Sequence, residues 1–171
     1  TLAVVQSFAS PIMKAMHGVS FEAATTMITA YMLCGAAGMF AGGFVAARMP
    51  AASDRVVAWS MGIGAVLIVV DVTGWLGGFG SMAVLAATGL AVGIGGPSRD
   101  MMIKKATPKG ATGRVYGTVY SGLDMGFALA PLIYGFFMDR GHYGLTLMLA
   151  AVFLMLSVGA ALGVGKRTAA A

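Results

Sequence analysis

Two aspartates, Asp71 and Asp124, are the only charged residues inside the long apolar runs of this sequence. Asp124 lies nine residues beyond Val115, which is about 14 Å along a helix that rises 1.5 Å per residue. In a helix that crosses a bilayer, this depth is near the middle. A charge there costs at least about 3 kcal/mol, and it is tolerated when it is paired, hydrated or protonated. Asp124 is therefore a candidate proton carrier, and the alternative is a neutral aspartate bonded to a neighbouring helix.

The remaining polar groups lie nearer to the ends of apolar runs. Asp71 is about 22 Å beyond Val56 along a helix, so we expect it to reach headgroups or water and to have a structural or interfacial role. Gln6 and Ser10 interrupt the first apolar run. They are candidates to bind a solute, or they bond a neighbouring helix. His17 is expected to be a solvated loop residue.

The sequence lacks the patterns of an enzyme or a metalloprotein. No nucleophile has a plausible base near it, so no catalytic residue is predicted, and no group of histidines, cysteines and acids has metal-ligand spacing. Cys34 is the single cysteine, which excludes an internal disulfide. The Gly-Ile-Gly-Gly stretch at 93–96 does not follow a strand and is not followed by the Gly-Lys-Ser/Thr of a phosphate loop. We predict no enzyme activity, no metal and no cofactor.

The elements that hold these residues are long apolar runs. The chain is 58% hydrophobic and 10% charged, with a mean hydropathy of +0.87, whereas soluble domains carry about 25% charged residues. Five runs are long enough for the roughly 20 residues of a membrane-spanning helix. These runs are 23–47, 56–76, 77–98, 115–138 and 143–165. The sequence predicts an all-α polytopic membrane protein with the lipid bilayer as its surroundings.

The first apolar run is shorter than the others. It covers about 13 residues, whereas a spanning helix needs about 20, and the sequence begins with Thr1 and not with methionine. We therefore expect the first helix, over residues 1–16, to be truncated and an N-terminal part of the protein to be missing.

The basic residues predict the orientation in the membrane. Nine of the eleven lysines and arginines fall on one side of the predicted spans, and Lys14 and Arg140 fall on the other. Because positively charged loops stay in the cytoplasm, we expect the loops at 48–55 and 99–114 and the C-terminus to be cytoplasmic. Nucleic-acid binding is disfavoured, since the basic residues are not interleaved with aromatic ones. The candidate functional charges of these loops are Arg48, Asp54, Arg55, Arg99, Asp100 and Arg114.

Small residues line one face of several predicted helices. In the fifth run, this stripe consists of Gly113, Gly117, Ser121, Asp124, Ala128, Pro131 and Gly135, and a bulky face consists of Tyr116, Tyr120, Leu123 and Phe127. Small faces let membrane helices approach closely, so we expect the stripe to pack against protein and the bulky face to meet lipid. The candidate gating or packing residues are Gly89, Gly93, Gly117, Gly126 and Pro131, and packing alone would explain most of the glycines.

Residues 95–141 resemble the tenth and eleventh helices of major facilitator transporters. The resemblance rests on Gly-Gly-Pro-Ser-Arg-Asp at 95–100, Thr-Pro-Lys-Gly-Ala-Thr-Gly-Arg at 107–114, the glycine-rich stretch 117–126, Ala-Pro at 130–131 and Asp-Arg-Gly at 139–141. Residues 42–48 are similar to that family's loop between helices eight and nine. Ala47 stands where that family has an acid, and Pro50 interrupts the usual continuation, although Asp54 and Arg55 are partial substitutes.

The resemblance implies the C-terminal half of a major facilitator fold. The six runs would be helices seven to twelve, built as two three-helix inverted repeats, with Asp124 on a gating helix and Asp71 on a peripheral one. It implies secondary active transport of a small solute by alternating access, and Asp124 as a candidate proton carrier makes H⁺ a candidate coupling ion. Residues 95–126 are also similar to bacterial fosmidomycin-resistance-like and organic-anion or drug efflux members, and the Ala- and Gly-rich composition suggests a bacterial inner membrane. The alternative function is a membrane-embedded structural or receptor-like subunit without transport.

Overall fold

The computed structural model of the chain describes residues 2–169, and every regular element within them is helical. The helices are α1 (Leu2–His17), α2 (Phe21–Arg48), the short 3-10 helix η1 (Pro50–Ala52), α3 (Ser53–Val72), α4 (Gly77–Ala106), α5 (Thr112–Met138) and α6 (Tyr143–Ala169). Five helical segments are long and apolar enough to cross a membrane: α2, η1 with α3, α4, α5 and α6. The predicted all-helical membrane fold is confirmed.

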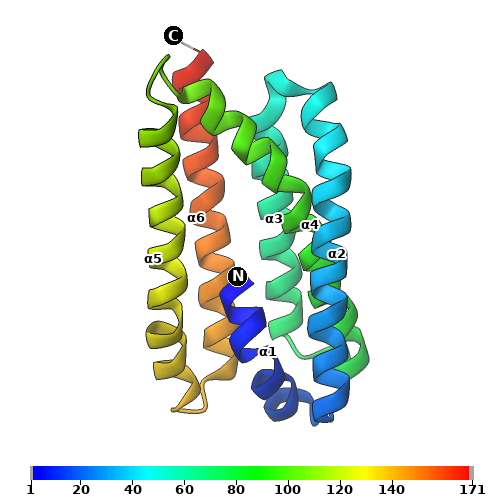
Figure 1. Cartoon of the computed structure of the whole chain (residues 1–171). Helices are drawn as coiled ribbons and strands as arrows, with labels where there is room; N and C mark the ends of the chain where they lie inside the picture. The colour runs from blue at the N-terminus through cyan, green and yellow to red at the C-terminus, as the bar shows by residue number, and fades with distance from the viewer. Residues whose placement is uncertain (1, 170–171) are drawn as a thin grey trace.

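The long helices lie side by side in one bundle, and α1 reaches only part of the way along it (Figure 1). The α2–α3 and α4–α5 connections lie at the same end as the C-terminal end of α6, and the other three connections lie at the opposite end (Figure 1). The first of these ends is here called the basic end, because it contains the segments 48–55 and 106–114. Nζ of Lys105 donates a hydrogen bond to the carbonyl oxygen of Pro50 there, which joins α4 to η1.

Two helix boundaries differ from the predicted ones. The helix predicted to end at Ser98 continues through Pro97 to Ala106, because residues 99–106 add two turns, about 12 Å, in which the charged side chains of α4 can leave an apolar layer. The helix predicted to end at Leu76 stops at Val72. Gly74 and Gly77 then adopt φ values of 71° and 61°, the left-handed conformation that glycine adopts without strain, and form a tight turn into α4.

The closest helix contact is the crossing of α2 and α4. A Cβ atom built on Gly38 or Gly42 would overlap the backbone carbonyl of Leu90 or Ile94. From the other side, a Cβ atom on Gly89 or Gly93 would overlap the carbonyl of Tyr31 or Gly35. The two backbones therefore touch directly, which is the geometry that small residues permit between membrane helices. The structure thus places the packing candidates Gly89 and Gly93 at this crossing.

Some of the helix contacts are related by a twofold exchange. Helix α4 packs against α2 and α3, whereas α1 packs against α5 and α6, and α3 packs against α6. Exchanging α1–α3 with α4–α6 maps each of these pairs onto another pair or onto itself, as expected of two three-helix repeats. Among residues 2–169, the contacts of α6 with α4 and α5 have no equal counterpart in the contacts of α3 with α1 and α2, so the exchange relates part of the bundle.

Most of helix α5 is uncovered in the described part of the chain. Of its residues, only Ala130 and Tyr134 are buried, and a Cβ atom on Gly113 or Gly117 of the small-residue stripe would meet nothing within 4 Å. The bulky face is also exposed at Tyr120, Leu123 and Phe127. The expected packing of the stripe against protein therefore stays a prediction.

Candidate functional site

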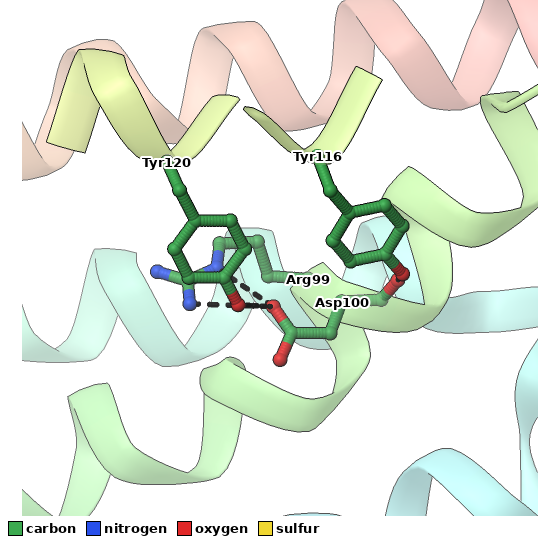
Figure 2. Close-up of polar contacts among 4 residues, drawn as sticks. All are labelled: Arg99, Asp100, Tyr116 and Tyr120. Atoms are coloured by element: carbon green, nitrogen blue, oxygen red, sulfur yellow. Dashed lines mark hydrogen bonds and ion pairs between the residues drawn. The ribbon is translucent and has the colours of Figure 1, made fainter. Parts of the chain in front are cut away.

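A polar cluster joins α4 to α5 near the basic end (Figure 2). The hydroxyl of Tyr120 donates to Oδ1 of Asp100 at 3.5 Å, and the hydroxyl of Tyr116 donates to the backbone carbonyl of Asp100 at 3.3 Å. The two tyrosine rings stack, with centroids 6.2 Å apart and planes 13° apart. Tyr116 and Tyr120 are four residues apart and share a helix face, so a single acidic residue of α4 can accept from both.

Arg99 completes this cluster. Its guanidinium lies 3.3 Å from Oδ1 of Asp100, but both side chains are about two-fifths exposed, at 39% and 43%. An exposed ion pair contributes about 0–1 kcal/mol, so the tyrosine hydrogen bonds and the ring stacking define the contact more than the ion pair does. A small cavity of about 40 Å³ beside the cluster is lined by Arg99, Ile103, Val119, Tyr120 and Leu123.

One interpretation of the sequence requires correction at this cluster. Arg99 and Asp100 were expected in a loop, but they lie within α4. The hydroxyls of Tyr116 and Tyr120 reach Asp100 of that helix, while the Tyr120 side chain stays 40% exposed. Ending the helix at Ser98 left this contact of the tyrosines unpredicted. The pair of tyrosines at a four-residue spacing, close to an acid, is the signal that would have predicted the contact.

The cluster supports a double-mutant prediction. Asp100→Ala and Tyr120→Phe should be non-additive by about 0.5–1 kcal/mol in the free energy of unfolding, the contribution of a hydrogen bond between side chains. Asp100→Ala and Tyr116→Phe should be additive, since Tyr116 bonds the backbone of Asp100. Denaturant unfolding in detergent micelles measures both pairs. Equal non-additivity in the two double mutants would contradict the assignment of Tyr120 to the carboxylate of Asp100 and of Tyr116 to its backbone carbonyl.

Asp124 lies on the flank of α5 beside this bulky face. It follows Leu123 and is therefore turned about 100° from it around the helix. Its side chain is exposed, and it has no hydrogen-bond or ion-pair partner among residues 2–169. Ser121 is also exposed, and its hydroxyl donates to the carbonyl of Thr118 at 2.9 Å. Pro131 lies on the same flank and is exposed. The structure thus places Asp124, Ser121 and Pro131 on one uncovered side of α5.

The candidates of α1 lie apart from those of α5. Gln6 is exposed, and its Nε2 atom lies 3.8 Å from the sulfur of Met32 on α2, while Ser10 is half-buried. Helix α1 meets α5 through Phe8 and Tyr134, whose ring centroids are 6.3 Å apart. No hydrogen bond joins Gln6 or Ser10 to Asp124 within the described part of the chain, so these candidates do not form one cluster there.

The charges of the predicted loops gather at the basic end. Arg48 is the last residue of α2, Arg55 lies in the first turn of α3 and Arg114 lies in the first turn of α5, and all three are exposed. Asp54 is half-buried beside α6, where a Cβ atom on Gly165 would overlap its carboxylate. These charges therefore occupy one end of the bundle, while Asp124 lies along α5.

A second polar cluster at the opposite end corrects two further expectations. Asp71, expected to reach headgroups or water, is 1% exposed. His17, expected to be a solvated loop residue, is the last residue of α1, and its Nε2 atom lies 2.9 Å from the hydroxyl of Ser81 on α4. Depth along a helix predicted that Asp71 is near an interface, but burial also depends on neighbouring helices. Here α1 and the start of α4 cover that position.

The largest cavity described here is an apolar groove on the outer side of the bundle. Its volume is about 600 Å³, and it runs between α3 and α4, with Arg55 and Trp59 among its lining residues. Neither this groove nor the small cavity at the α4–α5 cluster includes Asp124, Ser121, Gln6 or Ser10. Among residues 2–169 there is also no group of three or more histidines, cysteines and acids that could hold a metal ion.

These features define a class of protein. Six helices, five of them able to span a bilayer, with backbone-to-backbone packing on glycine, make this a multi-pass integral membrane protein. The sequence model of one protein family, the Major Facilitator Superfamily, matches residues 2–170 of this chain. The chain therefore belongs to the major facilitator superfamily, whose members transport small solutes across membranes and are not enzymes. The family expected from residues 95–141 is confirmed. No curated protein and no solved structure matched the chain.

Proposed function

We propose that this chain is the C-terminal half of a secondary active transporter that moves a small solute by alternating access. The observation that carries the proposal is the family match over residues 2–170, together with the six α-helices that residues 2–169 form. In this proposal the six helices are the seventh to twelfth of a full transporter, and an N-terminal half of the same protein is their partner.

The uncovered flank of α5 supports a partner in the membrane. This flank carries Gly117, Ser121 and Asp124, which are exposed along a helix that is otherwise apolar. Small residues favour close contact with another membrane helix, and a carboxyl group at membrane depth requires protein or water beside it. A second half packed near this flank would supply both. We propose that Asp124, with Ser121 beside it, lies on the path of a coupling proton, and that Gln6 and Ser10 face the solute path.

The distribution of charge supports an orientation. Arg48, Arg55, Lys105 and Arg114 lie at the basic end, whereas Lys14 and Arg140 lie toward the other end. By the positive-inside rule, we propose that the basic end and the C-terminus are cytoplasmic and that the membrane is a bacterial inner membrane. The similarity of residues 95–126 to fosmidomycin-resistance-like and organic-anion efflux members suggests that the solute is an organic anion or a drug.

Counterflow tests the proposal directly. The full-length protein is reconstituted in vesicles loaded with an unlabelled organic anion, and uptake of the labelled form of the same anion is followed. The experiment is repeated with several organic anions, and fosmidomycin is one of them. We expect transient accumulation of at least one label above the level in protein-free vesicles, because an alternating-access carrier exchanges solute without net transport. No accumulation for any of these anions, with the protein still correctly folded, would favour the structural or receptor-like subunit.

A further inference from the structure

Three helices meet at a buried polar cluster that the proposed transport path does not use. Asp71 of α3 is 1% exposed, Ser81 of α4 is fully buried, and His17 of α1 is half-buried. Nε2 of His17 lies 2.9 Å from the hydroxyl oxygen of Ser81. The carboxyl group of Asp71 lies near enough to Ser81 and His17 for both to act on it, although neither of its oxygens forms a hydrogen bond among the described residues. The three side chains therefore gather at one place, with the imidazole half-buried and the carboxyl group buried, and a turn of the Ser81 hydroxyl would join the carboxyl group to the imidazole.

The carboxyl group of Asp71 lacks the partners that a charge would need. Neither of its oxygens has a hydrogen-bond partner within residues 2–169. Among the described residues, the imidazole of His17 is the ionisable group that acts on it. The other ionisable side chains near this end are Lys14, Glu22, Asp139, Arg140 and His142, which are exposed, and Tyr143 at the start of α6, which is half-buried. A buried ionised carboxylate without a partner is far costlier than a neutral carboxylic acid, so the surroundings favour the protonated form.

We propose that Asp71 is a proton-binding site that holds α1 against the α3–α4 hairpin, and that Ser81 and His17 conduct the proton to it. A proton from water binds Nδ1 of His17. The proton on Nε2 of His17 passes to the oxygen of Ser81, whose own hydroxyl proton passes to the carboxylate of Asp71. One proton is then bound at Asp71, and His17 is neutral again as its other tautomer.

The packing of α1 gives this site a mechanical effect. Ile12 and Met13 of α1 are fully buried, and a Cβ atom on Gly78 would lie 3.6 Å from Cβ of His17, so the end of α1 presses on the first turn of α4. An ionised Asp71 requires water, and water reaches it when the end of α1 moves away. The docked state is therefore favoured at low pH and weakened as the pH rises through the titration of Asp71.

Infrared spectroscopy tests proton binding. Spectra of the full-length protein in lipid nanodiscs at low pH should contain the C=O band of a buried carboxylic acid, and raising the pH should remove it. Asp71→Asn should remove a component of the band that Asp124→Asn leaves in place, and Asp139→Asn, which alters an exposed carboxyl at the same end, should leave the whole band unchanged. A band of unchanged shape and intensity in Asp71→Asn, or the absence of any such band in the unmodified protein, would overturn the proposal.

Hydrogen exchange tests the link to α1. The amide side chain introduced by Asp71→Asn is neutral at every pH, so α1 should stay docked in this variant at every pH. The exchange rate of its backbone amides at 2–17 is therefore the reference for the docked state. Relative to it, the unmodified protein should exchange about tenfold faster for each pH unit between the pH at which a water-exposed aspartate ionises, about 3.9, and the titration midpoint of docked Asp71, and the ratio should be constant above that midpoint. A constant ratio at all pH values would overturn the proposed docking.

The proton path has its own test, which also applies if Asp71→Asn does not fold. Ser81→Ala and His17→Gln keep the carboxyl group, so the infrared band should remain, but its recovery after a drop in pH should slow by at least about tenfold. His142→Gln is the matched control and should recover at the normal rate. Normal recovery in both path variants would exclude Ser81 and His17 as the route. None of these measurements depends on transport.

Discussion

Replacing Gly42 with valine should destabilise the bundle severely, by at least about 1–3 kcal/mol, the usual cost of overpacking. A Cβ atom at this position would lie 2.9 Å from Cα of Ile94 and would overlap its carbonyl oxygen. The obstacle is backbone and not a flexible side chain, so α2 and α4 must separate along their length. The measurement is the temperature at which half of the detergent-solubilised protein remains monodisperse in size-exclusion chromatography.

Gly43 provides the matched control for this substitution. It is the next residue of the same helix, and a Cβ atom on it would meet nothing within 4 Å among the described residues. Gly43→Val adds the same side chain with the same change in helix propensity and should leave the transition temperature nearly unchanged. A comparable loss of stability in both variants would mean that the direct contact of the two backbones is not what makes Gly42 necessary.

Asp124→Asn should abolish proton movement that is driven by the solute, while counterflow of the labelled solute continues. Asparagine keeps the shape of the side chain but cannot bind a transferable proton. The carboxyl of Asp124 is exposed on α5 and has no partner within residues 2–169. It is therefore free to exchange a proton with water or with a group on a neighbouring helix. A pH-sensitive dye inside proteoliposomes measures proton entry when solute is added.

Asp139→Asn is the control for Asp124→Asn. Asp139 directly follows α5 and is exposed, so its substitution removes a carboxylate near the same helix but away from the middle of the span. We expect normal proton movement in this variant. Unchanged coupling in Asp124→Asn would exclude Asp124 as the proton carrier and would favour a neutral aspartate that bonds a neighbouring helix. That outcome would leave transport itself in place.

The membrane fold was predictable from the sequence because span length and apolar composition are properties of single segments. Each run of about 20 apolar residues satisfies the bilayer on its own, and charges such as Arg48 and Arg114 mark the ends. The helix boundary at Ser98 was wrong because a helix can continue beyond the apolar layer into water. Composition shows where a segment leaves the hydrocarbon layer, but it does not show where the helix ends. The helical hydrogen bonding of α4 continues as far as Ala106.

The lateral relations between helices were harder to predict. Two glycine pairs with the same four-residue spacing have opposite surroundings: a Cβ atom on Gly89 or Gly93 would overlap the backbone of α2, whereas one on Gly113 or Gly117 would meet nothing within 4 Å among the described residues. A small-residue stripe shows that a helix can approach another closely, but it does not identify the partner. The burial of Asp71 has the same cause, because its neighbours come from helices distant in sequence.

The tight turn between α3 and α4 has a consequence for how this protein enters the membrane during synthesis. When α3 first enters the bilayer, Ser81 has not yet followed it, and the carboxyl of Asp71 faces lipid or water without the cover it has in the finished bundle. Only the few residues from Thr73 to Leu76 separate the two helices. We therefore expect the insertion machinery to release α3 and α4 into the bilayer together, as one hairpin, with α1 closing over them afterwards.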